Sequence, residues 1–148
     1  MKSFLLLFFI SITSISAQQF NPIENADLSQ LSDGWYKFVT DNASFDVEVI
    51  NHTLNKGNIS WFDGSTYSGD LRGNTLHGKG TYTWANGMKY EGKLKKHMRH
   101  GKGTLTLQNK NKWSGKWKEN RKNGKGKIFD EEGAVIKEGI WENDVLIK

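Results

Sequence analysis

Hydrophobic and polar residues alternate with a period of two on both sides of Asn86-Gly87. Tyr82 and Trp84 alternate with threonines before this pair, and Tyr90 and Leu94 lie among charged residues after it. Such alternation is typical of strands with one buried face. Asn-Gly is favoured in the tight turn of a β-hairpin because both central residues need positive φ. The pattern therefore predicts a hairpin that turns at Asn86-Gly87.

The hairpin unit recurs every 23 residues. Its markers are a Tyr/Trp-x-Gly triplet at 67–69, 90–92 and 113–115, and a Gly-x-Gly triplet at 78–80, 101–103 and 124–126. A fixed period of this length indicates a repeat architecture in which each unit packs against its neighbours. We expect the glycine of the first triplet to leave room for an aromatic ring from the next strand, and Gly-Lys-Gly to bend the chain into the following strand.

Copies of the unit divide the chain. Clear copies span 59–127, whereas 34–58 and 128–148 are degenerate copies that would cap the two ends and block edge pairing. The predicted fold is all-β. It is an elongated, single-layer, twisted antiparallel sheet of successive hairpin repeats, with about ten strands.

The first residues have the layout of a secretory signal peptide. Lys2 is followed by an apolar run from Phe4 to Ile12 and by small residues that end at Ala17. This run is about half of the ~20 residues that a membrane span requires. We expect a cleaved signal at 1–17, with Ser16 as the alternative cleavage position. The mature protein is then exported, periplasmic or extracellular, with no transmembrane segment.

A polar segment, 18–33, precedes the repeats. Asn21 is a capping residue, Pro22 suits the first helical position, and Glu24 is placed to reach back to the cap. These residues predict a short helix over 22–31.

Alignment of the copies assigns large side chains to one face of the sheet. The expected aromatic groove consists of Tyr67, Tyr82, Trp84, Tyr90, Trp113, Trp117 and Trp141. A single-layer sheet must cover such rings by twisting, by self-association or with a partner, because large exposed apolar patches are unusual. Covering by twist and binding of a protein partner in the groove both stay open.

Positive charge is concentrated in the repeats. The formal net charge is +5, but residues 61–128 contain 16 Lys/Arg and 4 Asp/Glu. Such a block is a candidate surface for anionic partners. The alternative is that the charges keep the wet face soluble and deter edge pairing. The candidate residues are Arg72, Lys79, Lys93, Lys95, Lys96, Arg99, Lys102, Lys116, Lys118 and Lys125.

Catalytic and metal-binding motifs are not evident. There are no cysteines, so disulfides and thiolate metal sites are excluded. His97 and His100 have helical metal-ligand spacing, but they fall in a predicted strand-and-bend region, where we expect structural roles. We predict no enzyme activity, no cofactor and no metal. Nucleic acid is an improbable partner for an exported protein.

Tyr-x-Gly-x-Leu/Trp-(Lys/Arg), followed by Gly-Lys-Gly-x-(Tyr/Leu) at a 23-residue period, resembles the MORN repeat family, named for membrane occupation and recognition. The resemblance covers 61–141 well and 34–60 loosely. It implies an elongated twisted sheet that binds acidic phospholipids, or that scaffolds proteins through the aromatic groove or by self-association. We therefore expect a non-enzymatic binding module that attaches through its basic face to acidic phospholipid as a peripheral membrane protein. The alternative is protein scaffolding through the aromatic groove.

Overall fold

The protein is described by a computed structural model over residues 19–24 and 26–148, so the predicted signal peptide lies outside the described residues. Eleven strands and no helix occur in this part of the chain. The strands are β1 Gly34–Val39, β2 Ala43–Ile50, β3 Thr53–Trp61, β4 Thr66–Arg72, β5 Thr75–Thr83, β6 Lys89–Lys95, β7 Met98–Thr106, β8 Lys112–Lys118, β9 Arg121–Phe129, β10 Val135–Glu142 and β11 Val145–Leu146.

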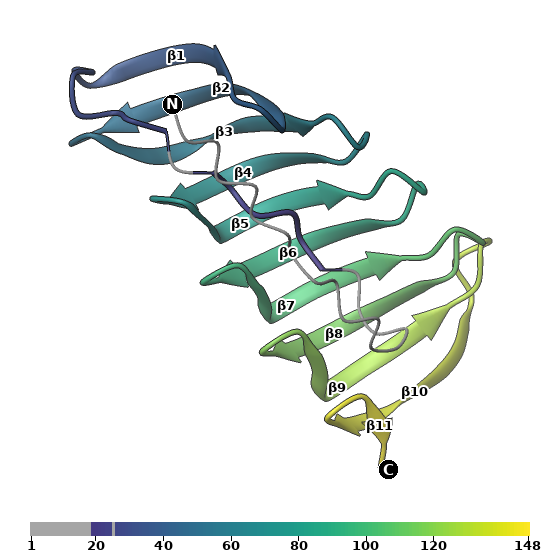
Figure 1. Ribbon diagram of the computed structural model, residues 1–148. Coiled ribbons are helices and arrows are strands. Elements are labelled where there is room, and N and C mark those ends of the chain that lie inside the picture. Colours follow the sequence, from purple (N-terminus) through teal and green to yellow (C-terminus); the bar gives the residue numbers. More distant parts are fainter. Residues whose placement is uncertain (1–18, 25) are drawn as a thin grey trace, which may run out of the picture.

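The strands form one open antiparallel sheet in which spatial order equals sequence order (Figure 1). Each strand pairs with the one before and the one after it, and the sheet twists along its length. Equivalent glycines face each other across neighbouring strands, as in Gly80 opposite Gly92 and Gly103 opposite Gly115. The predicted all-β, single-layer sheet of successive hairpins is confirmed.

The hairpins do not turn tightly at Asn86-Gly87. Gly87 has φ 87°, but Asn86 is not in the positive region. The Trp84 amide donates to the Met88 carbonyl at 2.9 Å, so the loop is longer than two residues. The Asn86 side chain accepts from the Met88 amide at 3.0 Å and holds this longer loop. The prediction of a tight Asn-Gly turn was wrong, although the hairpin itself is present.

Tight turns lie at the other end of each repeat. Lys96 and His97 join β6 to β7 with φ of 49° and 66°, and Glu119 and Asn120 join β8 to β9 with 47° and 68°. Two consecutive residues with positive φ give the type I′ geometry that matches strand twist. The sequence did not reveal the turns at Lys96-His97 and Glu119-Asn120 because they contain no glycine, unlike the equivalent turn at Gly73-Asn74.

Gly-Lys-Gly does not bend the chain into the following strand. Gly78 and Gly80 both lie inside β5, and the register with β4 shifts opposite them, between Gly69 and Leu71. The triplet is therefore a bulge within a continuous strand, which increases local twist.

Aromatic rings lie over the glycines of the neighbouring strand. A Cβ on Gly80 would collide with the Tyr67 ring, and one on Gly103 would collide with the Tyr90 ring. The prediction concerned Gly69 and Gly92, where a Cβ would meet the backbone of the next strand and the hydroxyl of the tyrosine two residues earlier. The ring therefore does not come from the next strand, as predicted, but from the Tyr-x-Gly strand itself. Burial raises the pKa of both phenols. Each hydroxyl donates to a backbone carbonyl, from Tyr67 to Asp70 at 2.6 Å and from Tyr90 to Lys93 at 2.7 Å.

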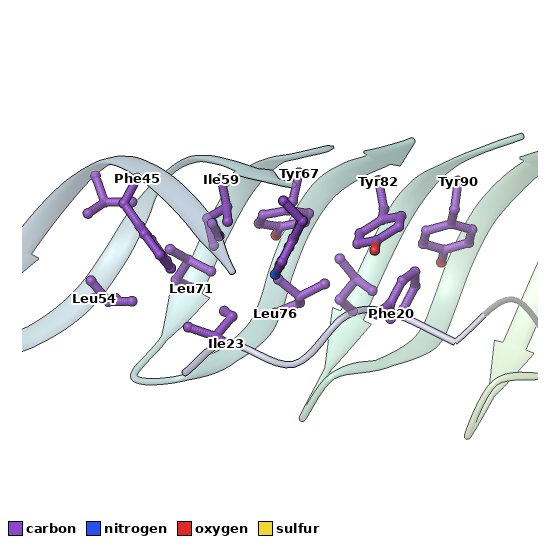
Figure 2. Packing of buried hydrophobic residues seen from close by; sticks show 14 of the residues in the cluster. Phe20, Ile23, Phe45, Leu54, Ile59, Tyr67, Leu71, Leu76, Tyr82 and Tyr90 are labelled. Carbon is purple, nitrogen blue, oxygen red and sulfur yellow. The ribbon is translucent and has the colours of Figure 1, made fainter. Parts of the chain in front are cut away.

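The segment before β1 is extended. It runs along one face of the sheet, and Figure 2 shows Phe20 beside Tyr82 and Tyr90. Phe20, Ile23 and Leu28 are buried. We call residues 19–24 and 26–31 the N-terminal strap. The predicted helix over 22–31 does not form, because the extended chain buries these side chains against the sheet and tertiary contact overrides local propensity.

Candidate functional site

The two faces of the sheet differ in chemistry because side chains alternate along each strand. The aromatic face carries Tyr67, Tyr82 and Tyr90, all buried. The opposite side we call the lysine face. In β6 the buried Tyr90 and Leu94 belong to the aromatic face, while Lys93 between them is exposed on the lysine face.

A row of exposed lysines crosses the lysine face. Lys79 lies directly opposite Lys93 in the β5–β6 pair, and Lys102 lies directly opposite Lys116 in the β7–β8 pair. Lys125 continues the row in β9 and lies opposite Ile140. Directly opposed residues have Cβ atoms about 5 Å apart. We call these five residues the lysine row.

Four more of the predicted basic residues lie along one edge of the sheet. Arg72, Lys95 and Lys118 are the exposed last residues of β4, β6 and β8, and Lys96 is exposed in the turn after β6. Together with the lysine row, they bring nine of the ten predicted residues to the lysine face or this edge.

Four lysines elsewhere on the lysine face have carboxylate partners. Ion pairs join Lys37 to Asp46 at 3.4 Å, Lys56 to Glu48 at 3.5 Å, Lys89 to Glu91 at 3.1 Å and Lys127 to Glu138 at 2.9 Å. Within the described ranges, no ion pair involves a residue of the lysine row. Like charges directly opposite each other destabilise a sheet. The two opposed pairs of the lysine row therefore carry a repulsion that the four ion-paired lysines avoid.

A hollow of about 940 Å³ lies on the lysine face over β7–β10. Lys102, Lys116 and Lys125 border it, and half-buried Phe129 and Ile140 add an apolar end. Its lining includes the glycines at 103, 115, 126 and 139, where the sheet has no side chains. Glu91 and Glu138 also line it, and each is ion-paired with a lysine outside the row. The hollow thus combines several ammonium groups with two ion-paired carboxylates and a small apolar surface.

Arg99 was assigned to the basic surface incorrectly. It is only 2 % exposed and belongs to the aromatic face. Its guanidinium lies 4.5 Å from the centre of the Trp117 ring, and it donates to the Asn120 carbonyl at 3.1 Å. Burial lowers the pKa of Arg99. The chain reverses at Lys96-His97, so closeness in sequence to Lys95 does not mean the same face.

The aromatic face is covered by the chain itself. Of the seven predicted groove residues, all are buried except Trp84, which is half-buried. The strap covers part of this face, with the Phe20 ring 4.8 Å from Tyr82 and 5.6 Å from Trp84 between centres. Further along, Trp113 packs against Trp117 and Trp141, with ring centres 4.8 and 5.7 Å apart.

Hydrogen bonds fix the backbone of the strap. The indole N–H groups of Trp84 and Trp61 donate to the carbonyls of Gln19 and Pro22 at 3.0 and 3.1 Å. The amide of Asn21 donates to the Tyr82 hydroxyl at 3.1 Å. The signal for this contact was the presence of Phe20, Ile23 and Leu28 in an otherwise polar segment, but the sequence does not show which surface they meet.

The Asn21 side chain is held by the loop between β3 and β4. It donates to Asp63 Oδ2 at 2.7 Å and to Ser65 Oγ at 2.8 Å. The hydrogen bond from Asn21, together with those from Ser65, lowers the pKa of Asp63. Asp63 is therefore an ionised acceptor for the strap at neutral pH.

His97 links the strap to the repeats. Its Nδ1 accepts from the Leu76 amide at 3.2 Å, so its Nε2 carries the proton and donates to the Asn21 carbonyl at 2.8 Å. Burial lowers the pKa of His97, and the hydrogen bonds to strap carbonyls oppose this shift. A neutral imidazole fits both partners, which is the structural role expected for this histidine.

The described part of the chain contains neither a metal-binding cluster of acidic, histidine or cysteine side chains nor a helix that could span a membrane. Among residues 19–24 and 26–148, no three His, Cys, Asp or Glu side chains gather in a way that could hold a metal ion. No helix in those ranges is long and apolar enough to cross a membrane.

Comparison with known families agrees with this geometry. The MORN repeat model matches residues 67–89, 90–112 and 113–133 in succession, and each match begins at the ring that lies over the glycines. No curated protein matched the chain. MORN repeats are non-enzymatic modules that mediate binding or scaffolding. Three consecutive repeats in this register place the chain in the MORN repeat family.

Proposed function

We propose that this protein is a non-enzymatic binding module whose lysine face attaches to an anionic surface, most simply the head groups of acidic phospholipids. The observation that carries the proposal is the lysine row. Four of its five members form directly opposed pairs across neighbouring strands. No member has an ion pair in the described part of the chain, whereas Lys37, Lys56, Lys89 and Lys127 do.

A row of this kind suits a charged surface better than it suits solubility alone. Solubility requires charge, but it does not require like charges directly opposite each other. Each Lys or Arg near an anionic leaflet contributes about 1 kcal/mol. The row and the edge residues Arg72, Lys95 and Lys118 could act together, because one sheet holds them all.

The hollow bordered by Lys102, Lys116 and Lys125 supports the same proposal. An anionic head group there would meet several ammonium groups, and Phe129 and Ile140 would lie beside the start of an acyl chain. With the expected signal peptide, the membrane would be one met after export, and the protein would bind it peripherally. Scaffolding through the aromatic face is less favoured, because the strap occupies part of that face.

Vesicle flotation tests the proposal. The predicted mature chain, 18–148, is mixed with vesicles of neutral phosphatidylcholine or with vesicles that also contain acidic phosphatidylglycerol, at low and at physiological salt. We expect flotation only with acidic vesicles, and less of it at higher salt because screening weakens the attraction. Equal flotation with both lipids, or none with either, would contradict the proposal; in the second case a protein partner becomes the better hypothesis.

A further inference from the structure

We infer that the aromatic face over β3–β7 contains a recognition site for an extended peptide of the form aromatic-Asn-Pro-aliphatic, and that the strap residues Phe20–Ile23 are its ligand within the same chain. The inference does not depend on lipid binding. It rests on the residues that contact the strap, which differ from the residues at the same positions in other repeats.

The tryptophans that bind strap carbonyls occupy one repeat position. Trp61 and Trp84 are 23 residues apart, and each donates its indole N–H to the strap. The same position holds Leu107 and then Asp130 in the next two copies. Leu107 is 38 % exposed. Indole donors therefore occur at this position only in the copies that meet the strap.

The turn histidines follow the same rule. His97 uses Nδ1 to accept from the Leu76 amide, as Asn120 uses Oδ1 to accept from the Arg99 amide at 2.8 Å in the next repeat. Asparagine is therefore sufficient at this position to accept the hydrogen bond from the backbone amide of the preceding repeat. Histidine adds a second nitrogen, which reaches the Asn21 carbonyl at 2.8 Å.

The other end of the strap has a related contact. His52, in the β2–β3 turn, places its Nδ1 3.3 Å from the Leu28 carbonyl. Its counterpart in the next copy is Asn74. Both histidines at this turn position therefore contact strap carbonyls.

Asp63 and Tyr82 each carry a side-chain oxygen that their counterparts in the copy at 105–126 lack. Asp63 Oδ1 accepts from the Ser65 amide, as the Asn109 side chain does from the Asn111 amide, while Oδ2 is left to accept from Asn21. Tyr82 has the aliphatic counterparts Ile59 and Leu105, and its hydroxyl accepts from the Asn21 amide.

These contacts define what the site would accept. Most of them are to backbone groups of residues 19–22, which requires an extended chain. Phe20 enters a cage of Tyr82, Trp84 and Tyr90, and its ring meets His97 edge-on at 6.0 Å between centres. Asp63 and Ser65 accept hydrogen bonds from the side-chain amide of Asn21, which favours asparagine at this position. Proline suits the next position because it needs no donor there and favours an extended backbone before it.

The test supplies the ligand as a separate molecule. A fluorescent synthetic peptide of residues 19–31 is titrated by anisotropy into chain 18–148 carrying Phe20→Ala and Ile23→Ala, which weakens the tethered copy. We expect saturable binding, at least tenfold tighter than to the unchanged chain, because a tethered strap competes at an effective concentration of about 1 mM. A peptide of the same composition in scrambled order should not bind.

Matched variants assign the binding to the site. Adding His97→Asn and Trp84→Leu introduces side chains that other repeats tolerate at these positions, and peptide binding should fall at least tenfold. Leu107→Ala alters the same repeat position away from the strap and should leave binding unchanged. Circular dichroism checks that the sheet is intact. Failure of a folded Phe20→Ala/Ile23→Ala chain to bind peptide up to about 1 mM, or undiminished binding after His97→Asn/Trp84→Leu, would overturn the inference.

A second measurement applies if the Phe20→Ala/Ile23→Ala chain does not fold. His97→Asn/Trp84→Leu is then made in the otherwise unchanged chain, and hydrogen exchange is followed in residues 19–31 and in β7–β9. We expect at least tenfold faster exchange in the strap with β7–β9 unchanged. Equal exchange in the strap, or faster exchange throughout the sheet, would show that these residues serve the core and would overturn the inference.

Discussion

The two halves of the aromatic face have the same backbone, but different groups cover their aromatic rings. Over β3–β6, the strap covers Tyr82 and Tyr90 with the ring of Phe20. Over β7–β10, cations of the repeats lie on the rings, with Arg99 4.5 Å from the centre of Trp117 and Lys122 5.5 Å from that of Trp113.

One repeat position accounts for much of this difference. Leu76, Arg99 and Lys122 are 23 residues apart, and the aliphatic residue lies in the half that meets the strap. A long cation combines an apolar stem with a charged head, so it can lie along a ring and still reach polar partners at the edge of the sheet. The repeat therefore fixes the scaffold, while the residue at this position suits the type of cover.

The largest expected effect concerns the half without the strap. Trp113 is buried against Trp117 and Trp141 and lies over Gly126. Trp113→Ala should lower the free energy of unfolding by about 3–5 kcal/mol, measured by urea denaturation. Trp113→Tyr introduces the residue found at the equivalent positions 67 and 90 and should lower the free energy of unfolding much less. A loss below about 1 kcal/mol for Trp113→Ala would mean that these rings are not the core of this half.

Truncation of the strap should cost less. Phe20 is 7 % exposed, but the strap is a single segment that can leave the sheet without unfolding it. Phe20→Ala should therefore lower the free energy of global unfolding by about 1–3 kcal/mol and increase proteolysis within residues 19–31. A loss as large as that of Trp113→Ala would show that strap and sheet unfold as one unit.

Replacement of Arg99, which covers the Trp117 ring, directly tests the difference between the two halves of the aromatic face. Arg99→Leu introduces the residue found at 76, and replacement of a buried charged group by an apolar one is often neutral or stabilising. We expect a change within about 1 kcal/mol for Arg99→Leu. Arg99→Ala, which uncovers Trp117, should cost about 2 kcal/mol by thermal or urea unfolding. Arg99→Leu should leave vesicle flotation unchanged, because Arg99 does not reach the lysine face. Equal costs for the two variants would refute the covering role.

The smallest effect is a pH dependence of the strap. The pKa of His97 is lowered when the strap is bound, so its unbound form takes up a proton more readily. The contribution of His97 to strap binding is complete above its ordinary pKa of about 6.5 and is lost as pH falls through the lowered value. Hydrogen exchange in residues 19–31, corrected for intrinsic rates, should become faster on acidification from neutrality. His97→Asn should remove this dependence near pH 6; a dependence that persists in His97→Asn would assign it to another group.

Much of the fold was predictable because it depends on local alternation. The spacing of Tyr82, Tyr90 and the glycines was sufficient to predict successive hairpins and a single sheet. Asn86-Gly87 gave a wrong prediction of a tight turn because the Asn86 side chain supports a longer loop. The tight turn at Lys96-His97 was not predicted because it contains no glycine.

The errors at the candidate site have a common cause. Arg99 was grouped with Lys95 and Lys96 by closeness in sequence, although the turn between them places it on the other face. The strap was predicted to be helical from Asn21, Pro22 and Glu24, which report only local preference. Its position depends on contacts with residues up to 76 positions away, such as His97, and no local pattern encodes such a contact.

The central claim is that the lysines of the row bind an anionic surface because they are free of carboxylate partners. The most direct measurement compares two variants with the same change in net charge, Lys102→Gln/Lys116→Gln in the row and Lys37→Gln/Lys56→Gln among the ion-paired lysines. The affinity of each for acidic vesicles is determined at physiological salt. We predict that the first variant binds at least tenfold more weakly than the unchanged chain, and that the second binds nearly as well as it does. Equal weakening in both variants would contradict the account, because binding would then follow net charge and not the lysine row.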